Sequence, residues 1–278
     1  MSGPYELESE KKLDGEILDR IRELIYQKSG IKLDVRKESL IRARVGKRMR
    51  TLGLLNQEEY LRHVIESNDE KEIIHLLDAI STNVTSFFRD ADHFDLLKTL
   101  LKDWTASGQK RFRIWSSACS SGEEPYSIAM TVLESIGGNA DVKILATDIS
   151  TRVLEKAQLC MYESDKVSQI PADLKEKYLE KPSSNNRLYK VKPIIRNMIV
   201  FKRLNLSEIP FPMQGPMDAV FCRNVMIYFD HNTRRKLLNE ILRLLKPNGY
   251  LFVGHAESLI GLASGFRTIK PSVYLKEA

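Results

Sequence analysis

Strand-like and helix-like segments alternate along the chain from residue 111 onward. Four short apolar runs are typical of buried strands, at residues 111–118, 142–150, 217–224 and 250–258. Between them lie segments with the apolar spacing of helices, at residues 120–136, 151–159 and 233–249. Because parallel strands need a crossover that returns the chain to the same edge, this alternation predicts an α/β fold with a doubly wound, mostly parallel sheet. A final strand over residues 272–278 is expected to insert antiparallel at the edge.

Residues before this alternation show only helical patterns. Apolar residues recur at helical spacing in three segments, residues 17–30, 39–53 and 69–81. The first two end on Gly30 and Gly53, and Asn68 is a favourable N-cap for the third. We therefore expect three regions: a small all-helical domain over residues 1–81, a linker and connecting helix over 82–110, and the sheet domain over 111–278.

The alternation lapses between residues 160 and 204. Short strand-like runs at residues 187–191 and 197–204 flank no helix of comparable length, and a Pro-, Ser- and Asn-rich break precedes them. We interpret residues 160–204 as a small antiparallel β insertion in the sheet domain.

Composition excludes several classes of protein. Among 278 residues, 42% are apolar and 29% are charged, which is ordinary for a globular enzyme. No apolar run approaches the roughly 20 residues that span a bilayer, and the polar N-terminal segment lacks the core of a signal peptide. We therefore expect a cytoplasmic protein that does not insert into the membrane.

Cysteines and histidines give no sign of a metal site. Cys119, Cys160 and Cys222 are odd in number and widely separated, and the five histidines are scattered. Since no second ligand stands at metal-binding spacing, the three cysteines are interpreted as buried structural thiols in a reducing compartment. We predict that the protein binds no metal.

The segment after the first strand argues against a phosphate-bearing ligand. A dinucleotide enzyme would place G-x-G-x-x-G there, whereas this chain has Ser120, Ser121 and Gly122 followed by Glu123 and Glu124. Two carboxylates at a helix start repel a pyrophosphate and favour a ligand with positive charge, such as S-adenosylmethionine. The alternative is that Glu123 and Glu124 only complement the helix dipole.

Asp148 ends the second strand, where a carboxylate can accept hydrogen bonds from both ribose hydroxyls of a nucleoside. Alone this is weak, since Asp also caps helices. Together with the acidic turn after the first strand, it indicates a nucleoside cofactor without phosphate, and hence a methyltransferase.

The net charge of +6 suits either a nucleic acid or an acidic protein as partner. The segment after the third strand, residues 222–229, lacks the Asp/Asn-Pro-Pro-Tyr/Phe motif of DNA adenine methyltransferases. It also lacks a Pro-Cys nucleophile, because Cys222 lies between Phe221 and Arg223. We therefore expect no nucleic-acid partner.

Six segments in order resemble the CheR family of chemotaxis receptor glutamate methyltransferases. These are STNVTSFFRD, WSSACSSGEEPYSIA, ATDIS, FCRNVMIYF, LKPNGYLFVGHAES and VYL, at residues 81–90, 115–129, 146–150, 221–229, 245–258 and 273–275. The resemblance implies a Rossmann-like class I methyltransferase sheet domain. It further implies S-adenosylmethionine as methyl donor, S-adenosylhomocysteine as product, and the cytoplasmic helical region of membrane-bound receptors as partner, with recruitment to receptor arrays.

The resemblance also implies the site residues. It assigns cofactor contacts to Asn83, Thr85, Arg89, Glu124, Asp148, Asn205, Leu206, Arg223 and Asn224. Arg89, Arg223 and Tyr228 are the catalytic candidates, with the two arginines positioning the substrate carboxylate. For His255, a structural hydrogen bond is favoured over catalysis. Phe87 and Phe88 are expected to dock the linker onto the sheet domain.

Two other functions remain open: methyl transfer to another acceptor, such as RNA or a small acid, and a module that binds the cofactor without turnover. For a glutamate acceptor no general base is needed, because a carboxyl group with a pKa near 4.3 is already ionised at neutral pH. The enzyme mainly has to align the reacting atoms.

Two surfaces bear on the receptor. On a helix from Leu40 to Leu52, an apolar stripe of Ile41, Val45, Met49 and Leu52 leaves Arg44, Lys47 and Arg50 on the far side. We expect this basic face to dock acidic receptor helices, although it can equally be a solvated face. Some family members bind a receptor C-terminal pentapeptide through a glycine-rich loop in the insertion. The matching segment here, residues 181–188, has no glycine, so we expect no tether, and we expect a monomer.

Overall fold

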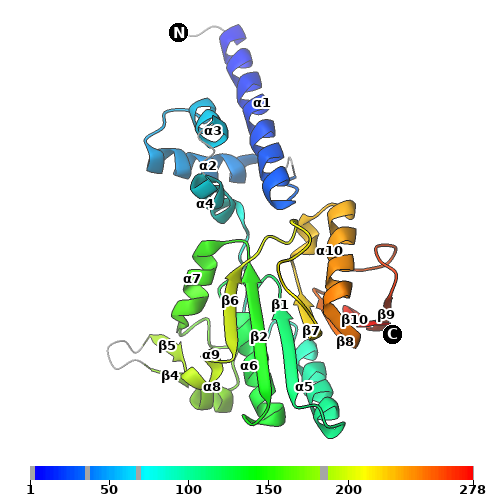
Figure 1. Cartoon of the computed structure of the whole chain (residues 1–278). Helices are drawn as coiled ribbons and strands as arrows, with labels where there is room; N and C mark the ends of the chain where they lie inside the picture. The colour runs from blue at the N-terminus through cyan, green and yellow to red at the C-terminus, as the bar shows by residue number, and fades with distance from the viewer. Residues whose placement is uncertain (1–3, 35–37, 67–69, 182–186, 278) are drawn as a thin grey trace. The chain divides into compact units, whose positions relative to one another are not determined.

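The computed structural model describes residues 4–34, 38–66, 70–181 and 187–277, and they form two compact units (Figure 1). The helical unit comprises residues 1–82 and a short segment, Tyr228–Asp230. The sheet unit comprises residues 83–227 and 231–278. The predicted class is confirmed: a mostly parallel α/β sheet, an all-helical N-terminal part and a small antiparallel insertion.

The helical unit contains α1 (Pro4–Ser29), α2 (Glu38–Leu52), α3 (Gln57–Glu66) and α4 (Glu70–Ile80). Gly30 and Gly53 follow the ends of α1 and α2 with φ of 69° and 71°, so both occupy the left-handed conformation that glycine favours. The sequence analysis did not identify α3. Its Tyr60 side chain is fully buried.

Helix α2 is fixed to α4 by two arginines. Arg44 donates to the carbonyl oxygens of Ala79, Ile80 and Ser81 over 2.5–3.2 Å, which satisfies carbonyls that the end of α4 leaves unpaired. Arg48 forms a two-pronged ion pair with Glu72. Ile41 and Val45 are buried as expected, but Arg44 is half-buried and does not belong to the exposed basic face predicted for it.

Seven strands form the main sheet, in the order β6-β2-β1-β7-β8-β10-β9. The five strands from β6 to β8 are mutually parallel, and β10 is antiparallel to both of its neighbours. The bounds are β1 Arg111–Ser116, β2 Asp141–Asp148, β6 Ile199–Arg203, β7 Met217–Cys222, β8 Leu245–Val253, β9 Phe266–Lys270 and β10 Val273–Lys276. The chain runs from β1 to one side and later returns to the other, so the topological switch point lies between β1 and β7.

The helices of the sheet unit are α5 (Ala91–Ala106), α6 (Glu123–Ile136), α7 (Thr151–Leu159), α8 (Ala172–Tyr178), α9 (Pro193–Arg196) and α10 (His231–Leu244). Ser150 caps α7 by accepting a hydrogen bond from the N–H of Val153. Helix α10 ends at Leu244 rather than near Pro247, because residues 245–253 pair with β7 as strand β8.

Two strand assignments differ from the sequence analysis. Ile199–Arg203, expected inside the insertion, is instead the edge strand β6 of the main sheet, parallel to β2. The final strand β10 is not at the edge, because β9 covers its outer side. The insertion's own sheet has the order β3-β5-β4, with bounds Met161–Glu163, Leu188–Val191 and Leu179–Glu180, and it is antiparallel.

One hydrophobic core supports the sheet unit. Fully buried aromatic side chains on β1, β7 and β8 meet in it, and Phe221 and Phe252 stack with their ring centroids 4.4 Å apart. No helix in the described residues is long and apolar enough to cross a membrane. The three cysteines are buried and form no disulfide, as expected.

Candidate active site at the carboxyl ends of the strands

Backbone hydrogen bonds join the loops that follow β1, β2 and β6. Asp148, the last residue of β2, accepts the N–H of Ser120 at 2.9 Å through one oxygen and the N–H of Ser150 at 3.0 Å through the other. Its carbonyl oxygen accepts the N–H of Leu204, just past β6. A single carboxylate therefore holds the first-strand loop and the start of α7 in place. Open sheets bind their ligands at these strand ends.

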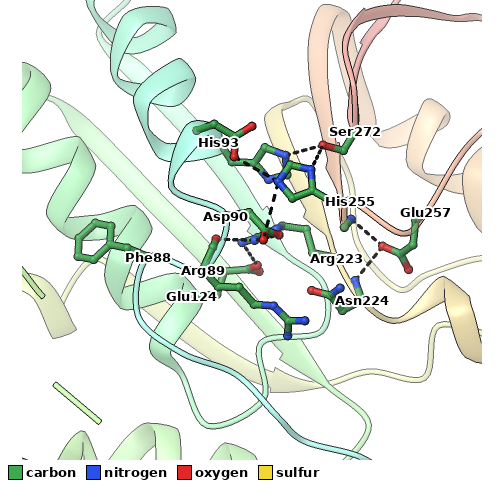
Figure 2. Close-up of polar contacts among 12 residues, drawn as sticks. Phe88, Arg89, Asp90, His93, Glu124, Arg223, Asn224, His255, Glu257 and Ser272 are labelled. Atoms are coloured by element: carbon green, nitrogen blue, oxygen red, sulfur yellow. Dashed lines mark hydrogen bonds and ion pairs between the residues drawn. The ribbon is translucent and has the colours of Figure 1, made fainter. Parts of the chain in front are cut away.

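Arg223 crosses the switch point from the end of β7 and binds two carboxylates (Figure 2). Its Nη1 donates to Glu124 Oε2 at 3.0 Å, and its Nη2 donates to Asp90 Oδ2 and to the carbonyl of Arg89. Ser116 donates to the other oxygen of Glu124 at 2.6 Å. Only 2% of the Arg223 side chain is exposed, so this guanidinium is engaged inside the protein.

Burial and ion pairing oppose each other at this network. Burial raises the pKa of Glu124, although Arg223 and Ser116 act to lower it. At Asp90, hydrogen bonding and charge attraction from Arg223 overcome burial and lower the pKa. Glu123, by contrast, turns toward Ser121, whose hydroxyl donates to it at 2.7 Å. Glu124 and Asp90 thus face the Arg223 guanidinium, and the Arg89 guanidinium also acts on Glu124 by charge attraction.

Backbone strain gathers around the same strand ends. Phe88, Asp90, Ser120 and Asn224 have φ between 48° and 57°, a left-handed conformation that is uncommon without glycine. Such residues cost on the order of 1–3 kcal/mol each and cluster at functional sites. The four bracket the Arg223 network, which is the conformational signature of a functional site.

The segment before α5 carries several of the implied cofactor residues. Its Phe87 is fully buried against Tyr162, and the N–H of Phe88 donates to Ser127 at 3.0 Å, so these residues dock it on the sheet unit as expected. Asn83 accepts the Ser120 hydroxyl through its carbonyl. Thr85 is half-buried.

Arg89 differs from Arg223 in its surroundings. Within the described residues, its guanidinium makes one hydrogen bond, from Nη1 to the carbonyl of Val84 at 3.1 Å. Its side chain is only partly covered. Arg89 therefore keeps donors that can reach a ligand.

Asn205 and Leu206 lie directly after β6 and are both buried. The Asn205 amide oxygen accepts the N–H and the hydroxyl of Ser207, and its Nδ2 donates to Glu208 at 2.7 Å. These bonds fix a tight turn next to the Asp148 carbonyl.

Two of the implied residues follow Arg223. Asn224 is half-buried, and its N–H donates to Glu257 at 2.8 Å. Tyr228 belongs to the helical unit, where its carbonyl accepts the N–H of Lys32 at 2.8 Å. Phe229 beside it pairs with Ile31 in a single antiparallel bridge.

A histidine pair lies beside Asp90. The Ser272 hydroxyl oxygen lies 2.6 Å from the Pro271 carbonyl, 2.8 Å from His93 Nε2 and 3.1 Å from His255 Nδ1, with donor and acceptor roles set by the tautomers of the two histidines. His255 Nε2 faces Asp92 at 3.3 Å and Asp90 at 3.8 Å (Figure 2). The favoured structural hydrogen bond of His255 is therefore present.

Asp92, His93 and His255 each bring a potential ligand atom within 4.8 Å of the others. Residues 163 positions apart in sequence show no metal-ligand spacing, so the sequence analysis missed this group. That the protein binds no metal stays a prediction.

The sequence analysis also missed Asp90, Ser116 and Glu257 as site residues. Asp90 and Glu257 stand inside the quoted motifs at residues 81–90 and 245–258. An acid within a motif that carries the family resemblance is the signal that could have identified them.

The observed residues fit S-adenosylmethionine. Asn83 Nδ2 is a buried donor that finds no acceptor within the described residues. The carboxylates of Glu124 and Asp90 suit an ammonium or sulfonium group. Asp148, at the end of β2, stands where a ribose is bound in folds of this type. Asn83, Glu124 and Asp148 would therefore hold the cofactor.

Comparisons with known proteins give the family of the chain. The family model described as CheR methyltransferase, SAM binding domain matches residues 83–275, and the one described as CheR methyltransferase, all-alpha domain, matches residues 16–81. A chemotaxis protein methyltransferase of Borreliella burgdorferi is 40% identical over 267 residues, covering 93% of each chain. Relatives of the same description from Pseudomonas aeruginosa and Escherichia coli are 38% and 39% identical, covering 93% and 92% of this chain and 92% and 88% of theirs. The chain belongs to the CheR methyltransferase family.

Proposed function

We propose that this methyltransferase esterifies glutamate side chains of chemotaxis receptors. The Glu124–Arg223–Asp90 network carries the proposal, because it places two carboxylates at the switch point of a sheet unit that matches the family's S-adenosylmethionine-binding domain. The names of the relatives support chemotaxis as the setting. The acceptor is then the cytoplasmic helical region of a receptor, and the enzyme acts as a monomer recruited to membrane receptor arrays.

The chain's own residues would bind and orient the reactants. S-adenosylmethionine supplies an electrophilic methyl group on a positively charged sulfur. Because the glutamate acceptor is already ionised, the protein provides alignment and exclusion of water rather than a base. Its catalytic candidates are Arg89, Arg223 and Tyr228.

The surroundings of the two arginines support a division of labour. Arg223 is occupied by Glu124 and Asp90, so it acts on the site by holding these carboxylates in place. Arg89, with donors to spare, is the arginine that would bind the substrate carboxylate through its guanidinium fork. Tyr228 would lie beside the transferable methyl group.

A methyl-transfer assay tests the function. With labelled S-adenosylmethionine, purified receptor and enzyme, the label should appear on receptor protein as an ester that base releases as methanol. Label on RNA or on a small acid would show that this molecule, and not the receptor, is the methyl acceptor. Calorimetric binding of S-adenosylhomocysteine without any turnover would instead favour a sensing module.

Replacing Asp148 tests the cofactor site. We expect Asp148→Ala to weaken S-adenosylhomocysteine, because each lost ribose hydrogen bond is worth roughly 0.5–1.5 kcal/mol. The change also removes the bonds to Ser120 and Ser150, so the circular dichroism and melting temperature of the variant should be measured alongside calorimetry. Unchanged affinity in a folded variant would remove Asp148 from the cofactor site.

A further inference from the structure

Glu257 binds four backbone amides at once. It lies in the turn after β8 and is 7% exposed. Its Oε2 accepts the N–H groups of Gly254 at 2.7 Å and Asn224 at 2.8 Å. Its Oε1 accepts those of Val225 at 3.1 Å and Ile227 at 3.3 Å. Each oxygen of one carboxylate thus serves two donors.

Four converging N–H donors favour the ionised form of the carboxylate at this position. Burial raises the pKa of Glu257, and the backbone hydrogen bonds oppose that rise by stabilising the anion. Glutamine has a single acceptor oxygen, so its amide N–H groups would face two of the four backbone donors. Leaving buried donors unpaired costs more than the bonds themselves contribute.

The four amides belong to two strand ends. Three of them come from the segment that follows β7, and Gly254 directly follows β8. Asn224 begins that segment with φ of 57°, in the left-handed region that asparagine tolerates better than most residues. The joint is tight: a Cβ on Gly254 would lie 2.6 Å from Asn224 Nδ2 and 2.9 Å from Glu257 Oε2.

We propose that Glu257 is a positioning residue for methyl transfer. As an anion it holds residues 224–227 in one conformation, and this segment connects Arg223 to Tyr228. Glu257 therefore acts through the residues beside the methyl group and touches neither reactant. The catalytic part of the inference rests on the proposed function, whereas the carboxylate's hold on the segment does not.

Glu257→Gln is the direct test, and Glu240→Gln is the matched control. Glu240 is a similarly buried glutamate of the same unit, which accepts the N–H of Phe211 at 2.8 Å and binds Arg243. We expect Glu257→Gln to lower kcat by 10- to 100-fold, because small misplacements of aligned groups have effects of this size. Its Kd for S-adenosylhomocysteine should rise by a smaller factor than kcat falls, because Asn224 is the one assigned cofactor contact within residues 224–227. Glu240→Gln should lower the melting temperature and leave kcat unchanged.

Amide resonances separate the two parts of the inference. In two-dimensional nitrogen–proton spectra of free protein, Asn224, Val225 and Gly254 should shift in Glu257→Gln and stay in place in Glu240→Gln. If these resonances do not move in a folded Glu257→Gln variant, the inference that Glu257 holds residues 224–227 in one conformation is wrong. Moved resonances with normal kcat, or an equal loss of kcat in Glu240→Gln, would overturn the catalytic role. Failure of the wild type to methylate receptor would overturn the proposed function, and the resonances would still report on the segment.

Discussion

At the scale of single residues, the neighbours of each side chain decide its role. Arg89 and Arg223 stand in equally specific motifs, and the sequence could not distinguish them. The structure buries Arg223 between Glu124 and Asp90, whereas among the residues that the structure describes Arg89 makes one hydrogen bond, to the Val84 carbonyl. Replacing Arg89 should therefore mainly lower receptor methylation, whereas replacing Arg223 should lower the free energy of unfolding.

Methionine substitutions compare the two arginines at similar length. Arg89→Met should lower receptor methylation at least about tenfold, with its unfolding free energy within about 0.5 kcal/mol of the wild-type value. Arg223→Met should lower the unfolding free energy by about 3 kcal/mol, because two buried carboxylates lose their counter-ion. Urea titration and steady-state kinetics measure both. Normal turnover in Arg89→Met, or full stability in Arg223→Met, would contradict this division.

His93 should make stability depend on pH. Burial lowers its pKa from an ordinary 6.5 to about 4. Between pH 6.5 and pH 4, His93 binds a proton in the unfolded chain but not in the folded protein. The free energy of unfolding therefore falls as the pH falls from 6.5 toward 4. The loss reaches at most about 3 kcal/mol.

Urea unfolding of His93→Gln measures this effect, because glutamine can keep a donor toward Ser272 and cannot titrate. The variant should show a flatter fall in stability than the wild type between pH 6.5 and 4. His75→Gln, at an exposed histidine of α4, should follow the wild-type curve. Parallel curves for His93→Gln and the wild type would show that His93 protonates normally.

At the scale of elements, helix α2 shows that an amphipathic pattern predicts the buried side chains but does not decide which polar side chains stay exposed after tertiary contacts form. The periodicity correctly buried Ile41 and Val45. It also placed Arg44 with Lys47 and Arg50 on one solvent-facing surface, but long side chains can reach across a helix interface. Arg44 does so and satisfies the end of α4, whereas Lys47 and Arg50 remain exposed.

Alanine substitutions on α2 should separate structure from docking. Arg44→Ala should destabilise the protein by about 1–3 kcal/mol, because buried carbonyls lose their donor. The pair Lys47→Ala and Arg50→Ala should leave stability within about 0.5 kcal/mol. The same pair should raise the receptor KM and flatten its salt dependence, if exposed positive charge speeds encounter with acidic helices.

Unaltered receptor kinetics at every salt concentration would show that Lys47 and Arg50 do not form the docking surface. Affinity for S-adenosylhomocysteine should not change in the double variant, which makes it the internal control for intact cofactor binding.

At the scale of the whole molecule, the insertion bears on how the enzyme is retained near its receptor. Its central strand β5 is paired on both sides by strands of two and three residues. Most of the glycine-free segment, residues 182–186, lies outside the described residues. The absence of a tether therefore remains a prediction from sequence.

Peptide titration tests that prediction. A synthetic peptide with the receptor's C-terminal five residues should show no saturable binding by calorimetry at concentrations up to about 100 μM, where ΔG of binding is near −5.5 kcal/mol. A scrambled peptide is the control. Saturable micromolar binding by the receptor peptide alone would show that the glycine-free segment still serves as a docking site.

The sequence by itself determined the fold class, the secondary-structure order around the sheet and the family. Hydrophobic periodicity and strand-end acids are local signals, so Asp148 and Glu124 could be proposed as site residues from their own segments. The sequence did not predict which strands pair when they are far apart in the chain. Strand β6 pairs with β2 in the main sheet, and β9 rather than β10 lies at the edge.

Only the tertiary structure decided which charges meet. Glu124, Arg223 and Asp90 come from three separate segments, and the four amides around Glu257 come from two strand ends. Ion pairs and buried hydrogen bonds depend on distances that sequence separation does not encode. The residue types and their order fix what this chain can fold into, and the packing of its strand ends fixes which of those residues hold the site together.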